Sequence, residues 1–219
     1  MNVHLFLDIN FKIVIFIKKE DMMARRKSVK KRNKIIESAA KLFAQNGYFC
    51  TSMSEIANRA EMSVGSLYVY FKSKDDLLIE IFKNYFDELM GNVEKIFTET
   101  EQHPLDKLFD GLNLVVNTLS NDKDMAKVFL VELRQSNKAL ESIAPEIRDK
   151  YENLIKNLID EAKEKDLVKK NIDPELIGLS TFGLIESILF DWINKGYTKE
   201  KLLMKLERAA NYFIQGIRK

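Results

Sequence analysis

The chain has 219 residues, of which 46% are apolar, enough for a sizeable hydrophobic core in one large or two small domains. Its 8 Gly and 3 Pro are too few for a loop-rich β fold, so we expect a mostly helical protein; the single Cys50 excludes an intramolecular disulfide framework and is typical of a cytoplasmic protein. The net charge of +2 does not by itself indicate a nucleic-acid partner.

Residues 1–23 form an atypical N-terminal extension. Its apolar run from Phe11 to Ile17 is far shorter than the roughly 20 residues needed to span a bilayer, and no signal-peptide cleavage site follows. We therefore expect no membrane association, and hypothesise that translation begins at Met22 or Met23. If the extension is retained, its β-prone sequence predicts a pairing or aggregating strand.

Residues 24–74 carry the positive charge, with 11 Lys and Arg against three Glu, which leaves a net +8. The basic arm from Ala24 to Lys34 is either a solvated helix start or a contact to phosphates or the minor groove. An apolar stripe from Ile35 to Phe43 then has helical spacing, and Gly47 ends that helix. The charge distribution favours this segment as the nucleic-acid-binding one.

The stretch from Thr51 to Lys74 has the spacing of a helix-turn-helix. One apolar face repeats at Met53, Ile56, Ala57 and Ala60, after a cap at Thr51 or Ser52. A second pattern starts at Ser63 and turns Val64, Leu67 and Phe71 to one side. In such a motif the second helix enters the DNA major groove.

The second helix is small at its start and rich in hydrogen-bond donors, as a recognition helix must be. The alternative is an ordinary helical hairpin with solvated hydroxyls. We expect base or nearby backbone contacts from Ser63, Ser66 and Tyr68, and phosphate contacts from Tyr70 and Lys74, where the next helix starts at Ser73. The full set of predicted DNA-binding residues is Thr51, Ser52, Ser63, Val64, Gly65, Ser66, Tyr68, Tyr70 and Lys74.

Residues 75–219 predict a second, all-α domain. Apolar stripes at helical spacing indicate helices over 75–100, from Pro104, from Asp122 or Lys123, over 145–164, over 173–193 and over 198–217. The helix that begins at Asp173-Pro174 is apolar almost all round and must be covered on every side. We therefore predict a symmetric homodimer through a four-helix bundle, which matches a palindromic operator.

Aromatic and Met side chains in this domain are candidates for an apolar pocket between helices, although each could simply belong to the core. A carboxylate within an apolar helix is costly unless it is paired, so Glu186 either has a partner or marks a site. The predicted ligand-binding residues are Phe86, Met90, Phe109, Phe129, Arg134, Phe182 and Glu186.

The segments AAKLFAQNGY and SMSEIANRAEMSVGSLYVYFKSKDDLL, within residues 39–78, resemble the DNA-binding domain of the TetR family of bacterial repressors. The resemblance implies an operator-binding regulator with effector release as its default. Glu61-Met62 departs from the family's usual Ala or Ala-Gly before the turn and adds a carboxylate near the DNA.

A shorter resemblance concerns VELRQSN at 131–137 with Gly183 and Glu186, which is similar to the acyl-CoA-responsive repressors of fatty-acid degradation. It implies an effector with a long apolar tail among the helices and an anionic head near Arg134 or a surface Lys.

Two other function classes compete with the repressor. The sequence has only His4 and His103, and no phosphate loop, metal cluster or nucleophile elbow, so we expect no catalytic residue, metal or cofactor. A helical protein-interaction adaptor without sequence-specific DNA binding would explain the amphipathic helices but not the hydroxyl-rich second helix. Salt-dependent DNA binding separates the two.

Overall fold

The computed structural model describes the backbone of residues 3–134, 138–141 and 143–219, and the side chains of residue 22 and residues 26–131, 138–141 and 143–219. The described residues form helices, with an isolated antiparallel bridge between Val168 and Arg218, which confirms the predicted all-α class. In chain order the helices are α1 (Val3–Asn46), α2 (Met53–Arg59), α3 (Val64–Tyr68), α4 (Lys74–Glu99), α5 (Pro104–Asn121), α6 (Lys123–Arg134), the short 3₁₀ helix η1 (Lys138–Leu140), α7 (Ala144–Glu164), α8 (Pro174–Lys195) and α9 (Lys199–Ile217).

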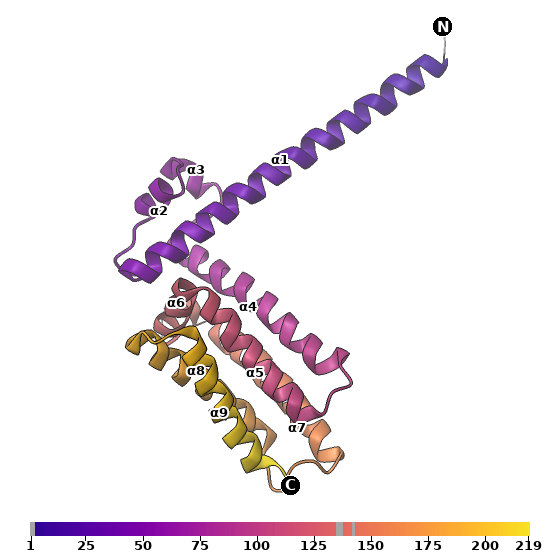
Figure 1. Cartoon of the computed structure of the whole chain (residues 1–219). Coiled ribbons are helices and arrows are strands. Elements are labelled where there is room, and N and C mark those ends of the chain that lie inside the picture. Colours follow the sequence, from indigo (N-terminus) through magenta and orange to yellow (C-terminus); the bar gives the residue numbers. More distant parts are fainter. Residues whose placement is uncertain (1–2, 135–137, 142) are drawn as a thin grey trace.

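The first three helices form a small N-terminal unit, in which α2 and α3 lie beside the C-terminal part of α1 (Figure 1). Its centre is apolar because Ile35 of α1, Ile56 of α2 and Leu67 of α3 are each 0% exposed. The short helices have too few residues to be stable alone, so this shared core is what holds them.

The N-terminal extension does not form the strand that its β-prone sequence predicts. It continues α1, which begins at Val3 and projects away from the rest of the molecule (Figure 1). The physical reason is that residues 3–46 contain neither Gly nor Pro, so nothing in the sequence interrupts the helix. The basic arm at 24–34 is accordingly part of a helix and not an extended tail.

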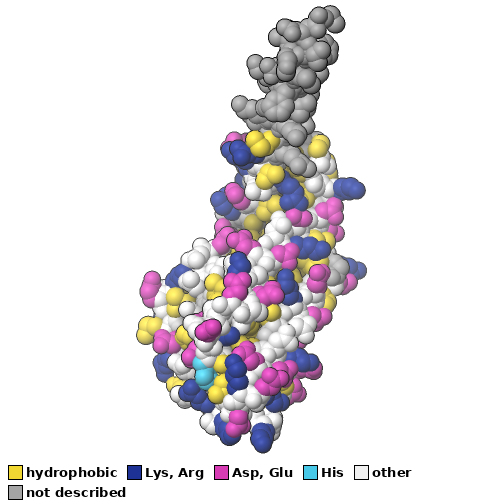
Figure 2. All heavy atoms as spheres, turned by 90° about the vertical axis from the view of Figure 1, so that its right-hand side faces the viewer, with side chains coloured by type: hydrophobic (Ala, Val, Ile, Leu, Met, Phe, Trp, Pro, Cys, Tyr) yellow, Lys and Arg dark blue, Asp and Glu magenta, His cyan; other side chains and the backbone are white. Residues whose placement is uncertain are grey.

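Helices α4 to α9 form the C-terminal bundle, and local capping explains where they start. Ser73 Oγ accepts a hydrogen bond from Asp76 N (3.0 Å), Asp173 Oδ1 accepts one from Glu175 N (2.9 Å), and Thr198 Oγ1 accepts one from Lys201 N (3.4 Å). The predicted starts of α4, α8 and α9 therefore agree with the structure. On the face drawn in Figure 2, basic and acidic side chains are intermixed over this bundle.

Helix α8 is long and apolar enough to cross a membrane by length and composition, with a mean hydropathy of 1.5 over its most apolar stretch. In the fold it packs one side against α7, and Ile185, Leu189 and Trp192 are buried. Apolar side chains on its other side stay exposed, with Leu176 at 57% and Leu179 at 43%. The single chain therefore covers only part of this helix.

Candidate nucleic-acid interface and regulatory cavity

Helix α2 is fixed at its start by a reciprocal capping box. Ser52 N donates to Glu55 Oε2 at 2.7 Å, and Glu55 N donates to Ser52 Oγ at 3.2 Å. The Ser52 cap is the one of the two predicted alternatives that the structure has. Because Ser52 is exposed at the start of α2, it stays among the predicted contacts to the DNA backbone.

The turn between α2 and α3 passes through Glu61, whose φ of 56° is in the left-handed region that favours glycine. Met62 N closes the turn by donating to Ala57 O at 3.0 Å. Lys34 Nζ of α1 lies 2.8 Å from Glu61 Oε2, and this contact holds the pKa of the Glu61 carboxyl below its usual range. The carboxylate that departs from the usual family sequence is thus paired with a cation of the same unit.

Helix α3 turns one face inward and the other to solvent. Leu67 and, just after the helix, Phe71 are buried, whereas Val64, Ser66 and Tyr68 are exposed. Ser63 caps the helix: its Oγ accepts from Ser66 N at 3.2 Å and lies 2.8 Å from Ser66 Oγ. The structure therefore presents hydroxyl groups at the first turn of α3, where a recognition helix needs them.

Gly65 has no role inside the chain that requires a glycine. A Cβ atom built on it would meet nothing within 4 Å, and its φ lies outside the left-handed region. If close approach is the reason for a glycine here, the approaching surface must belong to another molecule.

Val69 was missed by the sequence reasoning and, among the large apolar side chains that the structure describes, is the most exposed, at 81%. It follows α3 directly, between the two tyrosines. An exposed apolar group beside a recognition helix can contact the methyl group of thymine. The sequence did contain a signal for this residue. Leu67 and Phe71 are four residues apart and both face inward, so helical spacing places position 69, midway between them, on the outer side.

One predicted DNA contact needs correction. Thr51 is 2% exposed and its hydroxyl donates to Gly47 O at 2.9 Å, so it stabilises the loop after α1 and is not offered to solvent. Tyr70 is half-exposed because its ring packs against the core of the unit, and its phosphate contact stays a prediction.

Lys74 also has a different role from the predicted phosphate contact. Its Nζ donates to Tyr48 O (2.7 Å), Thr51 O (2.8 Å) and Phe49 O (3.4 Å), and lies 4.3 Å from the centre of the Tyr48 ring. An ammonium group has three protons, and all three are used here. Lys74 thus ties the start of α4 to the loop between α1 and α2.

Other basic groups of the unit remain available for phosphates. Lys72 is exposed, and no hydrogen bond or ion pair is recorded for it within the described part of the chain. Lys27, Lys30 and Lys31 of α1 are likewise exposed. These positions keep the positive footprint that the sequence predicts, although Lys74 is engaged elsewhere.

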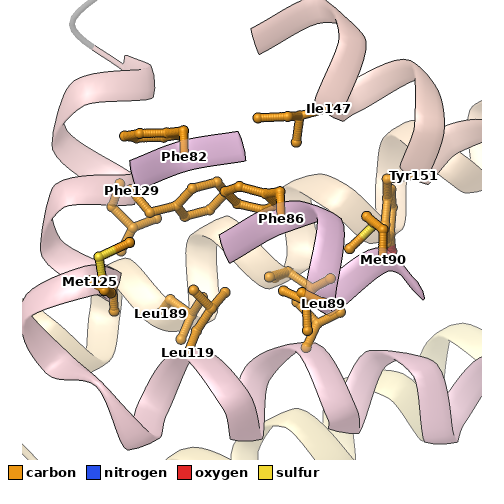
Figure 3. Packing of buried hydrophobic residues seen from close by; sticks show 14 of the residues in the cluster. Phe82, Phe86, Leu89, Met90, Leu119, Met125, Phe129, Ile147, Tyr151 and Leu189 are labelled. Carbon is orange, nitrogen blue, oxygen red and sulfur yellow. The ribbon is translucent and has the colours of Figure 1, made fainter. Parts of the chain in front are cut away.

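The C-terminal bundle encloses a small apolar cavity of about 20 Å³. Five predicted ligand-binding residues border it: Phe86 and Met90 from α4, Phe129 from α6, and Phe182 and Glu186 from α8. The Phe86 and Phe129 rings lie next to each other, 4.7 Å apart between centroids (Figure 3). Such a volume holds about one water molecule, so the cavity is closed in this conformation.

Two predicted ligand-binding residues are not placed at this cavity. Phe109 is half-buried against the core elsewhere on α5 and does not border it. The side chain of Arg134 lies outside the described residues. The structure adds Tyr151 and Ile147 of α7, which the sequence placed in the core without indicating a cavity.

Tyr151 is the unusual member of this wall. It is 3% exposed, and its hydroxyl has no hydrogen-bond partner among the described residues. Burial raises the pKa of the hydroxyl, so the group stays protonated and neutral. Tyr151 and Glu186 are the two residues of the cavity wall that carry ionisable groups.

A second hollow of about 80 Å³ adjoins the cavity, because Phe86, Met90 and Ile147 border both. Lys83 and Lys150 border it, as do Asp87 and Glu146, and Lys150 Nζ lies 3.7 Å from Asp87 Oδ1. An apolar interior that opens beside two lysines can accommodate a molecule with an apolar tail and an anionic head.

Helix α4 links the cavity to the DNA-binding unit. Its buried Ile81 borders a groove of about 400 Å³ that α1, α4 and α6 share, and Phe86, five residues further on, borders the cavity. Phe82, which is 1% exposed, lies 6.3 Å from Phe129 of α6 between ring centroids. The cavity is therefore bordered by α4 and α6, the two helices against which α1 packs.

These features define a helix-turn-helix DNA-binding regulator with a separate helical regulatory domain. Comparison with known proteins supports this class. Residues 35–81 match the bacterial regulatory proteins of the tetR family, and residues 82–216 match the C-terminal region of YsiA-like proteins. The chain belongs to the TetR family of transcriptional regulators, as its sequence motifs predict.

Its relatives include regulators of fatty-acid metabolism. The chain is 31% identical over 159 residues to the fatty acid metabolism regulator protein of Bacillus subtilis (strain 168), covering 73% of this chain and 81% of that protein. The structure of the fatty acid degradation regulator FadR from Bacillus halodurans matches with a TM-score of 0.78 and 28% identity, covering 85% of this chain and 95% of that one. FadR from Bacillus subtilis, solved in complex with stearoyl-CoA, matches with a TM-score of 0.76 and 29% identity, covering 84% and 98% of the two chains. The predicted resemblance to the fatty-acid branch is thereby confirmed.

Proposed function

We propose that the protein is a cytoplasmic repressor that binds a palindromic operator as a homodimer and is released by a small apolar effector, with long-chain acyl-CoA as the candidate. The observation that carries the proposal is that α4 joins an exposed, hydroxyl-bearing recognition helix to a closed apolar cavity. A DNA-binding surface with such a cavity behind it can be controlled by whatever opens the cavity.

The homodimer is supported by one face of α8. Leu176, Leu179, Gly183 and Phe190 recur at helical spacing, and the three large side chains are 43% exposed or more. A Cβ atom at Gly183 would meet nothing within 4 Å, so this face can approach a second helix closely. Exposed Met204 and Tyr212 of α9 extend the apolar surface, and a second copy would cover it in a symmetric bundle.

The effector must change the conformation in order to bind. Ligand pockets usually have volumes of about 300–1,000 Å³, whereas the closed cavity measures about 20 Å³. An acyl chain can enter only when helices that border the cavity, α4 and α6 among them, separate, and it then favours that conformation. A tenfold difference in affinity between the two conformations shifts their equilibrium by about 1.4 kcal/mol.

Acyl-CoA is favoured over other apolar molecules by two findings. A solved relative carries stearoyl-CoA. In this chain, Lys83 and Lys150 border the hollow that adjoins the cavity, together with Asp87 and Glu146, and the two ammonium groups can pair with the phosphates of CoA.

The proposal is tested by fluorescence-anisotropy binding of the full chain to its own upstream DNA, at several salt concentrations. We expect tight, salt-sensitive binding that long-chain acyl-CoA relieves and that CoA without an acyl chain does not. DNA binding that acyl-CoA does not change would be consistent with the proposed repressor and would overturn the proposal that acyl-CoA is its effector. Weak binding at every salt concentration to that DNA and to a genome-wide fragment library would instead favour the helical adaptor.

A further inference from the structure

We infer that Tyr151 recognises the carbonyl group of a neutral acyl derivative, so that the cavity distinguishes an acyl thioester from ligands without that carbonyl. The inference rests on the proposed acyl-CoA effector, and it names the residue and the bond that would select this class of ligand. It begins from the buried hydroxyl of Tyr151, which borders the cavity together with apolar residues and Glu186.

A buried hydroxyl without a partner costs free energy, because it has given up its hydrogen bonds to water. The Tyr151 ring is held in place by an edge contact with Phe182, with 5.6 Å between ring centroids. Figure 3 shows the side chain beside Met90, at the edge of the aromatic cluster around Phe86. A bound molecule with a hydrogen-bond acceptor would remove this cost, whereas a purely aliphatic one would not.

The surroundings of the hydroxyl leave it free to donate. Thr181 of α8 affects the Tyr151 pKa, and its own proton is donated to Ile177 O (2.8 Å) and Gly178 O (3.0 Å). Its oxygen could accept the Tyr151 proton, but it does not lie in hydrogen-bonding geometry with the Tyr151 hydroxyl. Burial keeps the tyrosine protonated. The group therefore offers a proton to an incoming oxygen.

The acceptor that fits is a neutral carbonyl oxygen. Glu186 borders the same cavity, and no ion pair is recorded for its side chain among the described residues, so a second carboxylate would meet an unfavourable like charge. A thioester has a carbonyl oxygen without a net charge, whereas a free fatty acid is an anion at pH 7. The two polar groups of the wall together favour the thioester.

The experiment compares two ligands that differ only at this carbonyl: palmitoyl-CoA and S-hexadecyl-CoA, a thioether with a methylene in its place. Each is titrated into the full wild-type chain below its self-association concentration, and the ratio of the two dissociation constants is measured. A net hydrogen bond between neutral groups predicts that the wild type prefers the thioester by roughly three- to tenfold. In Tyr151→Phe this preference should fall to about one, while both ligands still bind.

Tyr85→Phe is the matched control. Tyr85 also has a buried hydroxyl without a partner among the described residues, but it borders the groove between α1, α4 and α6, away from the cavity. Both substitutions remove an unsatisfied hydroxyl, so neither should prevent folding. Tyr85→Phe should keep the wild-type preference for the thioester.

The outcomes separate the inference from the proposed function. If Tyr151→Phe keeps the wild-type ratio, or if the wild type binds both ligands equally, the role of Tyr151 is overturned and the acyl-CoA effector stands. If neither ligand binds the wild type, the effector itself is wrong and the inference fails with it.

Discussion

Replacing Lys74 by Met should destabilise the fold more than it alters the electrostatic part of DNA binding. The Lys74 ammonium donates two short hydrogen bonds, to Tyr48 O and Thr51 O, and lies against the Tyr48 ring. Methionine keeps most of the side-chain length and removes the charge and all three donors. The loop between α1 and α2 would then lose the group that holds it to α4.

The expected loss follows from these contacts. Each short bond from a charged donor contributes about 1 kcal/mol at a half-exposed site, where the freed carbonyls regain water, and the ring contact adds about 0.5–1 kcal/mol. The free energy of unfolding should therefore fall by about 2–3 kcal/mol. Urea unfolding of the full chain measures this as a lower midpoint with an unchanged slope.

Lys72→Met is the matched control, two residues away and of identical chemistry. Its ammonium group is exposed, so the free energy of unfolding should change by no more than about 0.5 kcal/mol. If Lys72 contacts one phosphate, the slope of log affinity against log salt should fall by about 0.9. A stable Lys74→Met variant with a reduced salt slope would refute the reasoning and return Lys74 to the phosphate contacts.

Three further substitutions test other parts of the molecule. Gly65→Ala should raise the free energy of unfolding by up to about 1 kcal/mol, since alanine favours the helix and its Cβ meets nothing within 4 Å. The same substitution should weaken operator binding severalfold, and an unchanged DNA affinity would show that the DNA does not approach Gly65 closely. Asp191→Asn should lower the melting temperature at pH 7, because Lys195 and then Lys205 hold the pKa of the Asp191 carboxyl well below its usual range. A lowered pKa contributes stability that is fully present above the unfolded value of about 4 and is lost as the pH falls toward the lower folded-state pKa. The gap between the two melting temperatures should therefore narrow steadily below about pH 4, and a constant gap would contradict this assignment. Leu179→Glu should shift the sedimentation of the protein at micromolar concentration toward that of the monomer, without reducing its helix content. The control Glu94→Gln on α4 should leave the sedimentation unchanged. If Leu179→Glu sediments like the wild type, the exposed face of α8 is not part of the dimer interface.

Features encoded by neighbouring residues could be predicted from the sequence. The caps at Ser52, Ser73, Asp173 and Thr198 each use a hydrogen bond that spans two or three residues, so the pattern of side chains is sufficient to find them. The same holds for Leu67 and Phe71, whose helical spacing predicts that both face inward. Val64, which the same pattern placed on that face, is instead 37% exposed, because it lies at the first turn of α3.

The hydrogen-bond partners of long polar side chains could not be predicted from the sequence in this way. Lys74 meets carbonyl groups 23 to 26 residues earlier in the chain, and its role depends on how the loop after Gly47 folds back. Thr51 is buried by the same loop. Motif position alone suggested that both face the DNA, whereas the local fold uses their donors internally.

The cavity was predicted in part for a similar reason. Apolar spacing identified Phe86, Met90 and Phe129 as inward-facing, but spacing does not distinguish a filled core from one with an opening. Tyr151 had the same inward signal as its neighbours on α7. Only the three-dimensional packing shows that its hydroxyl lacks a partner there.

The closed cavity also bears on how regulation would operate. The Phe86 and Phe129 rings fill the space between α4 and α6, and both helices support α1. An acyl chain that separates these rings must displace at least one of the two helices, because close-packed interiors have little free volume in which a ring can move. If the operator prefers the closed arrangement, it must weaken acyl-CoA binding by the same factor by which acyl-CoA weakens operator binding. The energy that releases the DNA would thus come from filling a cavity that the DNA-bound form keeps shut.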